Sequence, residues 1–193
     1  MLAQLGFGQA SLLVTPIRMA LVAATIADGG RTPRPYLVRS IAGSETSLAT
    51  SPEQLAAPLG SEAAGEVRDL MIAVVQHGTG TVAALPGVTV AGKTGTATNG
   101  GIGVEPNSWF VGFGPANHPK YVVLCVIDEG GYGADAAAPV VARTFNYLVA
   151  HPIGPVRFKR QLTIPTTTTT KPHSTTTTTP TTTTPTTTTT THN

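Results

Sequence analysis

Five consecutive residues, Lys93-Thr94-Gly95-Thr96-Ala97, carry the strongest chemical signal in this sequence. They follow a segment in which valine alternates with smaller residues, a pattern that indicates a β-strand. An ammonium group, a hydroxyl group and a glycine at successive positions can form a cradle for an anion. Lys93 supplies positive charge, Thr94 supplies a directed hydrogen bond, and Gly95 lets a ligand approach the backbone.

The segment from Gly87 to Thr94 also matches the phosphate-loop pattern G-x-x-x-x-G-K-[ST]. The apolar run from Val122 to Ile127, followed by two acidic residues, even resembles the metal-binding strand of a nucleotidase. A phosphate loop, however, needs a helix directly after its lysine, because the helix N-terminus faces the phosphates. Here a glycine-rich stretch that ends at Pro106 follows the lysine, and such a stretch does not form a helix. The sequence therefore argues against an ATPase.

Composition narrows the function further. A formal net charge of +2 gives no electrostatic case for nucleic-acid binding. The single cysteine, Cys125, excludes an internal disulfide and a cysteine-based metal site, and we expect neither a metal nor a cofactor. Cys125 lies in an apolar run, where we expect a buried, inert thiol. Residues Met1 to Ala10 lack a basic start and a long apolar core, so we expect no signal peptide and no membrane span in this chain.

Three segments have the end signals of amphipathic helices. The first has Thr15 as its N-cap and ends at Gly29-Gly30. The second is capped by Ser61 and ends at Gly78-Thr79-Gly80, and the third begins at Pro139. Helical spacing predicts a buried face for each helix. In chain order these faces contain Ile17, Ala20, Leu21, Ala24 and Ala27 or Asp28; Ala64, Val67, Leu70, Met71, Val74 and Val75; and Val140, Val141, Thr144, Tyr147 and Leu148.

Three strands are expected at Val88 to Ala97, Ser108 to Phe113 and Lys120 to Asp128. Their short connections predict antiparallel neighbours, because a parallel crossover needs a dozen or more residues. A short extended segment is expected at Arg34 to Val38, and no firm element between Ser44 and Leu59. Trp109 and Phe113 are expected in the core. The prediction is an α/β (α+β) fold, an antiparallel sheet flanked by helices.

The chain ends in a segment of different composition. Residues 165–193 are almost entirely threonine with scattered proline, and they have no apolar face to bury. We expect a disordered tail there, joined by a linker at 151–164 to a folded portion at 1–150. Such tracts resemble O-glycosylated stalks of exported proteins, and an unmodified flexible tail is the alternative.

A set of short motifs follows a fixed order between Leu5 and about Ala150. They are Gly8-Gln9-Ala10, Thr15-Pro16-Ile17-Arg18-Met19-Ala20, Ile26-Ala27-Asp28-Gly29-Gly30, Pro35-Tyr36-Leu37-Val38, Val74-Val75 through Gly78-Thr79-Gly80, Pro86-Gly87-Val88, Ala91-Gly92-Lys93-Thr94-Gly95-Thr96-Ala97, Trp109-Phe110-Val111-Gly112-Phe113 and Ala137-Ala138-Pro139-Val140-Val141-Ala142. This ordered set resembles the C-terminal part of a class B penicillin-binding protein, a peptidoglycan D,D-transpeptidase. That resemblance implies a partial β-lactamase/transpeptidase-like fold, and Lys-Thr-Gly is one motif of this serine acyltransferase superfamily.

The resemblance also implies roles for the candidate site. Lys93 would supply positive potential, and Thr94 would hydrogen-bond the carboxylate of a peptide stem or a β-lactam. Gly95 would keep the strand edge open to substrate, and the backbone N–H of Thr96 would be one of two oxyanion-hole donors. The other reading is structural: the threonines would be ordinary strand residues and Lys93 an exposed edge charge.

The family's serine nucleophile lies in a Ser-x-x-Lys motif, and its second motif is Ser-x-Asn. Neither pattern occurs in this chain. We therefore expect a truncated or split transpeptidase that is inactive alone, because one oxyanion donor without a nucleophile cannot acylate. The alternative is a non-catalytic module that binds stem peptides or another partner. For the parent protein, the resemblance implies action at the extracytoplasmic face of the plasma membrane, with the missing N-terminal part of the domain as a further partner.

Overall fold

The computed structural model describes residues 6, 8, 12–43, 47–98 and 103–153. The helices are α2 (Pro16–Ala27), α3 (Ser61–His77) and α4 (Ala137–Ala150), with a 3-10 helix η1 (Thr81–Ala83). The strands are β1 (Thr32–Pro33), β2 (Ser40–Ala42), β3 (Ser47–Ala49), β4 (Gln54–Ala56), β5 (Ala91–Ala97), β6 (Asn107–Gly114) and β7 (Tyr121–Ile127). The predicted tail at 165–193 and most of the predicted linker lie outside the described residues. No described helix has both the length and the apolar character needed to cross a membrane.

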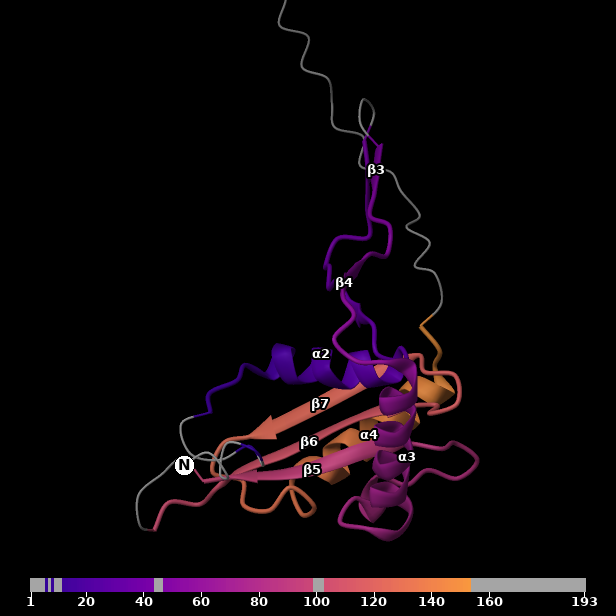
Figure 1. Cartoon of the computed structure of the whole chain (residues 1–193). Helices are drawn as coiled ribbons and strands as arrows, with labels where there is room; N and C mark the ends of the chain where they lie inside the picture. The colour runs from indigo at the N-terminus through magenta and orange to yellow at the C-terminus, as the bar shows by residue number, and fades with distance from the viewer. Residues whose placement is uncertain (1–5, 7, 9–11, 44–46, 99–102, 154–193) are drawn as a thin grey trace, which may run out of the picture. The chain divides into compact units, whose positions relative to one another are not determined.

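The three long strands form one antiparallel sheet in the order β5-β6-β7 (Figure 1), which confirms the predicted sheet. The first strand is shorter than predicted. It begins at Ala91, whereas Val88 forms only an isolated bridge with Leu85. The connection ahead of Ala91 is a tight turn with Gly87 at a φ of 73°, a conformation that favours glycine.

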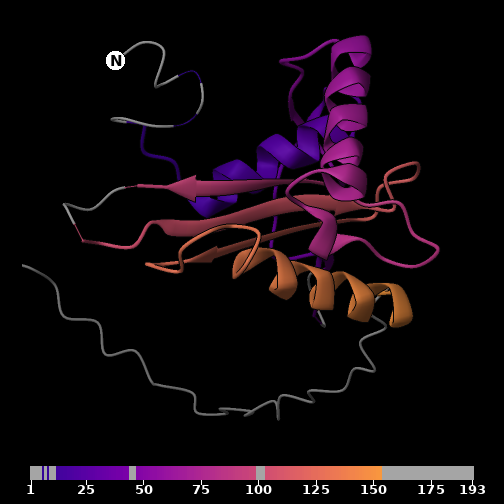
Figure 2. The ribbon, with the colours of Figure 1, turned by 90° about the horizontal axis from the view of Figure 1, so that it is seen from below.

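Figure 2 shows the sheet between α2 on one face and α4 on the other. The two clusters of buried side chains follow this arrangement. Phe110 of β6 packs with Val141 and Phe145 of α4, whereas Phe113 packs with Ala23 and Ile26 of α2. Residues of odd number in β6 therefore face α2 and residues of even number face α4, as strand alternation requires.

The apolar stripe predicted for α2 is wrong in its rotation about the helix axis. Ile17 is 59% exposed, and the buried residues are Ala23, Thr25 and Ile26. This helix has apolar residues nearly all round, so spacing alone could not select the face that meets the sheet. Thr15 is the N-cap residue, as predicted, but its side chain makes no capping hydrogen bond.

The faces predicted for the other two helices are partly wrong. In α3 the N-cap is Gly60 rather than Ser61, and Leu70 is 68% exposed. The α4 helix begins before Pro139, at Ala137, and its largest buried side chain is Phe145, which the sequence reading omitted. Tyr147, predicted to pack on the sheet, is 63% exposed.

Two small antiparallel pairs precede the sheet in the chain, β1 with β4 and β2 with β3. The segment from Arg34 to Val38, expected to be extended, follows β1 and is not part of a strand. The N–H of Arg34 donates to the carbonyl oxygen of Glu53 at 2.8 Å, so the pairing with the β4 side continues for one further bond. Such pairs depend on contacts between separate segments, which local sequence does not reveal.

Candidate functional site

The residues predicted to form the site lie together on β5. In the register with β6, Lys93 pairs with Val111, Thr94 with Phe110, Gly95 with Trp109 and Thr96 with Ser108. Side chains of directly paired residues point to the same face. Lys93 and Gly95 therefore share the α2 face with Trp109. Thr94 and Thr96 share the α4 face.

The backbone of β5 also alternates in direction. Within the described part of the chain, β5 has a strand neighbour only at β6, so its other edge is open to strand pairing, although α3 packs beside its first residues, with Val75 close to Gly92. A β-carbon added to Gly112 of β6 would lie 2.7 Å from the carbonyl oxygen of Ala91, so that oxygen points toward β6. The N–H and C=O of one residue point the same way, and direction reverses at each residue. This alternation directs the polar backbone groups of Thr94 and Thr96 toward the open edge.

The contacts of Lys93 agree with this direction of the Thr94 backbone. Its Nζ donates to the carbonyl oxygen of Thr94 at 2.7 Å, and its side chain is exposed to solvent. The ammonium group is thus held at the open edge of β5, beside the backbone that a ligand would meet. An arriving carboxylate could take over this donor, because an ammonium group binds an anionic acceptor more strongly than a neutral carbonyl.

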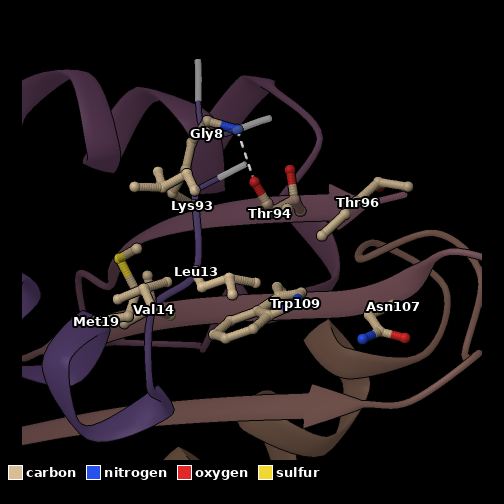
Figure 3. A pocket seen from close by; sticks show the side chains of 13 residues that line it. Gly8, Leu13, Val14, Met19, Lys93, Thr94, Thr96, Asn107 and Trp109 are labelled. Atoms are coloured by element: carbon tan, nitrogen blue, oxygen red, sulfur yellow. Dashed lines mark hydrogen bonds between the residues drawn. The ribbon is translucent and has the colours of Figure 1, made fainter. Parts of the chain in front are cut away.

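A cavity of about 390 Å³ lies against this strand. Figure 3 shows its polar side chains on β5 and the aliphatic side chains of Leu13, Val14 and Met19 on the opposing wall. The full lining is Gly8, Leu12, Leu13, Val14, Met19, Lys93, Thr94, Gly95, Thr96, Ala97, Asn107, Trp109 and Val111. None of these is a serine. The cavity combines a mostly apolar wall with a few polar groups, the usual character of a small-ligand site.

Trp109 was predicted to belong to the core, and the structure corrects this. The residue is partly buried and its indole lies at the cavity (Figure 3). Its Nε1 is buried and has no hydrogen-bond partner among the described residues. Phe113, predicted as core on the same pattern, is fully buried. Both residues face α2, so the apolar pattern of β6 did not distinguish them. Trp109 lines the cavity and Phe113 does not, since Trp109 lies opposite Gly95 in the register.

The opposite face of the site is held by a loop that the sequence reading did not identify. The buried Ser108 hydroxyl donates to the carbonyl oxygen of Tyr132 and accepts from the N–H of Ala137, both at 3.1 Å. These bonds fix the segment that contains Gly133 against β5 and β6. A β-carbon on Gly133 would lie 2.5 Å from the carbonyl oxygen of Gly95 and 2.4 Å from that of Trp109.

Thr79 is a second residue whose place at the site could not be predicted from the sequence, which indicates only that Gly78-Thr79-Gly80 ends a helix. Its Oγ1 lies 2.7 Å from Oγ1 of Thr94. The two residues come from the end of α3 and the middle of β5. No local pattern in the sequence could have paired them.

Cys125 lies away from the cavity, on β7, where it pairs with Phe110. It is a free, partly buried thiol, and burial raises its pKa above the ordinary value. The higher pKa keeps the sulfur protonated at neutral pH, which agrees with the inert thiol expected from the sequence.

Comparison with known proteins adds an independent line of evidence. A family model described as the penicillin binding protein transpeptidase domain matches residues 1–146. The peptidoglycan D,D-transpeptidase PbpA of Mycolicibacterium smegmatis is 39% identical over 142 residues, which is 69% of this chain and 29% of that protein. PbpA of Mycobacterium tuberculosis is 34% identical over 151 residues, 72% of this chain and 30% of that protein. The chain thus spans less than a third of the length of these curated relatives.

Solved structures agree in fold. Penicillin-binding protein A from M. tuberculosis, in a ceftriaxone acyl-enzyme complex, superposes with a TM-score of 0.70 at 32% identity. The match covers 75% of this chain and 34% of that one. The D,D-transpeptidase domain of a peptidoglycan glycosyltransferase from Eggerthella lenta gives a TM-score of 0.65 at 39% identity, over 72% of this chain and 33% of that one.

Proposed function

Because the chain belongs to the penicillin-binding protein transpeptidase domain family, we propose that it supplies the substrate-side strand of a peptidoglycan D,D-transpeptidase site. The observation that carries this proposal is the position of Lys93, Thr94, Gly95 and Thr96 along an open strand edge that lines a cavity. The ligands are the carboxylate-bearing peptide stem of peptidoglycan and β-lactams. The reaction served is cell-wall cross-linking, at the cell envelope.

Each residue has one role in this proposal. The Lys93 ammonium attracts the ligand carboxylate, and the Thr94 hydroxyl donates to it. Gly95 leaves room for the peptide to lie along the edge, and the N–H of Thr96 donates to the oxyanion of the acyl-transfer intermediate. The outward direction of the Thr94 and Thr96 backbone supports the last two roles.

The 193 residues contain no serine followed by lysine three positions later, and no Ser-x-Asn. We therefore propose that this chain alone binds its ligand reversibly and forms no acyl-enzyme. The nucleophile has to come from polypeptide outside these residues. The folded portion in this proposal is 1–150, with 151–164 as a linker and 165–193 as a Thr/Pro-rich tail.

Two measurements on the purified 193-residue chain test the proposal. Incubation with a fluorescent penicillin should give no covalent band after denaturing electrophoresis, and a band would refute the claim that the chain cannot acylate. Calorimetric titration with a peptide ending in D-Ala-D-Ala should show weak, saturable binding that Thr94→Val weakens further while leaving it measurable. Thr81→Val, an exposed threonine of η1 outside the cavity lining, is the matched control and should bind normally.

The outcomes separate the two hypotheses raised by the sequence: a truncated transpeptidase that is inactive alone, and a non-catalytic module that binds stem peptides. Reversible binding without acylation, sensitive to Thr94→Val, identifies β5 as a working carboxylate cradle. Absence of binding in the wild-type chain would contradict the proposed role of β5 in this polypeptide and leave only the family relationship.

A further inference from the structure

The contact between Thr79 and Thr94 joins the end of α3 to the centre of the candidate site. Their hydroxyl oxygens are 2.7 Å apart, the usual distance for a strong hydrogen bond between hydroxyl groups. Thr79 does not line the cavity, whereas Thr94 does. Any influence of Thr79 on a ligand in that cavity would therefore act through Thr94.

The position of Thr79 is tightly constrained by its neighbours. The N–H groups of Gly78 and Gly80 both donate to the carbonyl oxygen of Val74 at 3.0 Å. A β-carbon on Gly80 would lie 3.1 Å from Cγ1 of Val74 and 3.4 Å from the ring of Phe110. This close packing holds the turn against α3 and β6, so the Thr79 hydroxyl is presented to Thr94 by a rigid segment.

Two threonine hydroxyls have two protons between them, and their mutual bond uses one. If Thr79 donates, Thr94 has an occupied lone pair and keeps its own proton for another acceptor. The acceptor that approaches β5 is an anion, drawn by Lys93. An anion favours the arrangement in which Thr94 donates to it, and a hydroxyl that accepts one bond becomes a better donor in the next.

We propose that Thr79 is a positioning residue that donates to Thr94 Oγ1 and thereby turns the Thr94 proton toward the ligand carboxylate. This inference rests on the proposed function and adds a second hydroxyl to its carboxylate-recognition unit. Thr79 acts on the preference for a carboxylate over an uncharged end group, because the hydrogen bond that Thr94 donates is stronger to a charged acceptor than to a neutral one.

The test compares two probes: a peptide ending in D-Ala-D-Ala with a free carboxylate, and the same peptide with a terminal carboxamide. Calorimetric titration of the 193-residue chain should show tighter binding of the carboxylate. Thr79→Val should weaken carboxylate binding by up to roughly tenfold, as expected for the loss of one hydrogen bond between uncharged groups, and should weaken carboxamide binding less. Thr79→Ser keeps the hydroxyl and should restore the wild-type preference.

A double-mutant cycle separates this role from a purely structural one. If Thr79 acts only through Thr94, Thr79→Val should cause no further loss in the Thr94→Val background. Thermal unfolding of each variant checks the fold, with Thr79→Ala as the substitute if the valine variant does not fold.

The inference is overturned if Thr79→Val or Thr79→Ala keeps the carboxylate preference, or if the serine variant fails to restore it. It is also overturned if the losses of carboxylate affinity caused by the substitutions at positions 79 and 94 are additive. Failure of the wild-type chain to bind either peptide would instead refute the proposed function, and this inference with it.

Discussion

Gly133 lies directly against the backbone of Gly95: a β-carbon on Gly133 would stand 2.5 Å from the Gly95 carbonyl oxygen and 3.0 Å from its nitrogen. The glycine of the candidate site is therefore supported from behind by another glycine. Real β-carbons do not approach backbone atoms this closely, so a side chain here must displace either the loop or β5.

Gly133→Ala should therefore lower the free energy of unfolding by about 1–3 kcal/mol, the usual cost of overpacking a rigid site. Urea denaturation followed by circular dichroism measures this change. Gly65→Ala in α3 is the control, since a β-carbon there meets nothing within 4 Å. Alanine is the better helix former, so the control should be stabilised by about 0.5–1 kcal/mol. Equal effects at the two positions would show that the contact with Gly95 is not tight.

The α4 helix gives a second test, because sequence and structure disagree on which aromatic side chain is buried. Phe145 is 1% exposed and belongs to the same buried cluster as Val141 and Phe110, so Phe145→Ala should cost about 3–5 kcal/mol of stability. Tyr147 is exposed and stacks on His151, with ring centroids 4.4 Å apart. Tyr147→Ala should cost about 1 kcal/mol or less. The reverse order, measured by urea denaturation, would support the face predicted from the sequence.

Cys125 offers a test of pH dependence. Burial raises the pKa of its thiol, so the thiolate population at a given pH is smaller than for an exposed cysteine. Alkylation by iodoacetamide at pH 8 should be slower in the folded chain than in urea, and its pH midpoint should lie higher. Mass spectrometry of the alkylated protein measures both. Identical rates in folded and unfolded protein would contradict the partly buried position of the thiol on β7.

How much could be predicted from the sequence depended on the range of the interactions. The Lys93–Thr96 segment was placed correctly on a strand because its evidence is local: alternating valines before it and a glycine-rich loop after it. Antiparallel order followed from short connections. The rotation of α2 could not be predicted, since apolar residues surround that helix and only contact with Phe113 selects Ala23 and Ile26 as its buried face.

The supporting residues of the site were missed for the same reason. Thr79 reaches Thr94, and Gly133 reaches Gly95, only after the chain has folded. Their local sequences, a threonine between two glycines and a glycine in a loop, are typical of turns. Trp109 was assigned to the core because its neighbours in β6 are core residues, and only the position of the cavity distinguishes it.

The central claim is that the open edge of β5 binds a carboxylate-terminated stem peptide. Two-dimensional ¹H–¹⁵N NMR of the labelled 193-residue chain, titrated with a peptide ending in D-Ala-D-Ala, tests it residue by residue. We predict saturable shifts that are largest at Thr94, Gly95 and Thr96 and that require higher concentrations of the carboxamide peptide. Shifts absent from β5, or unchanged when the carboxylate is replaced by the amide, would contradict the claim.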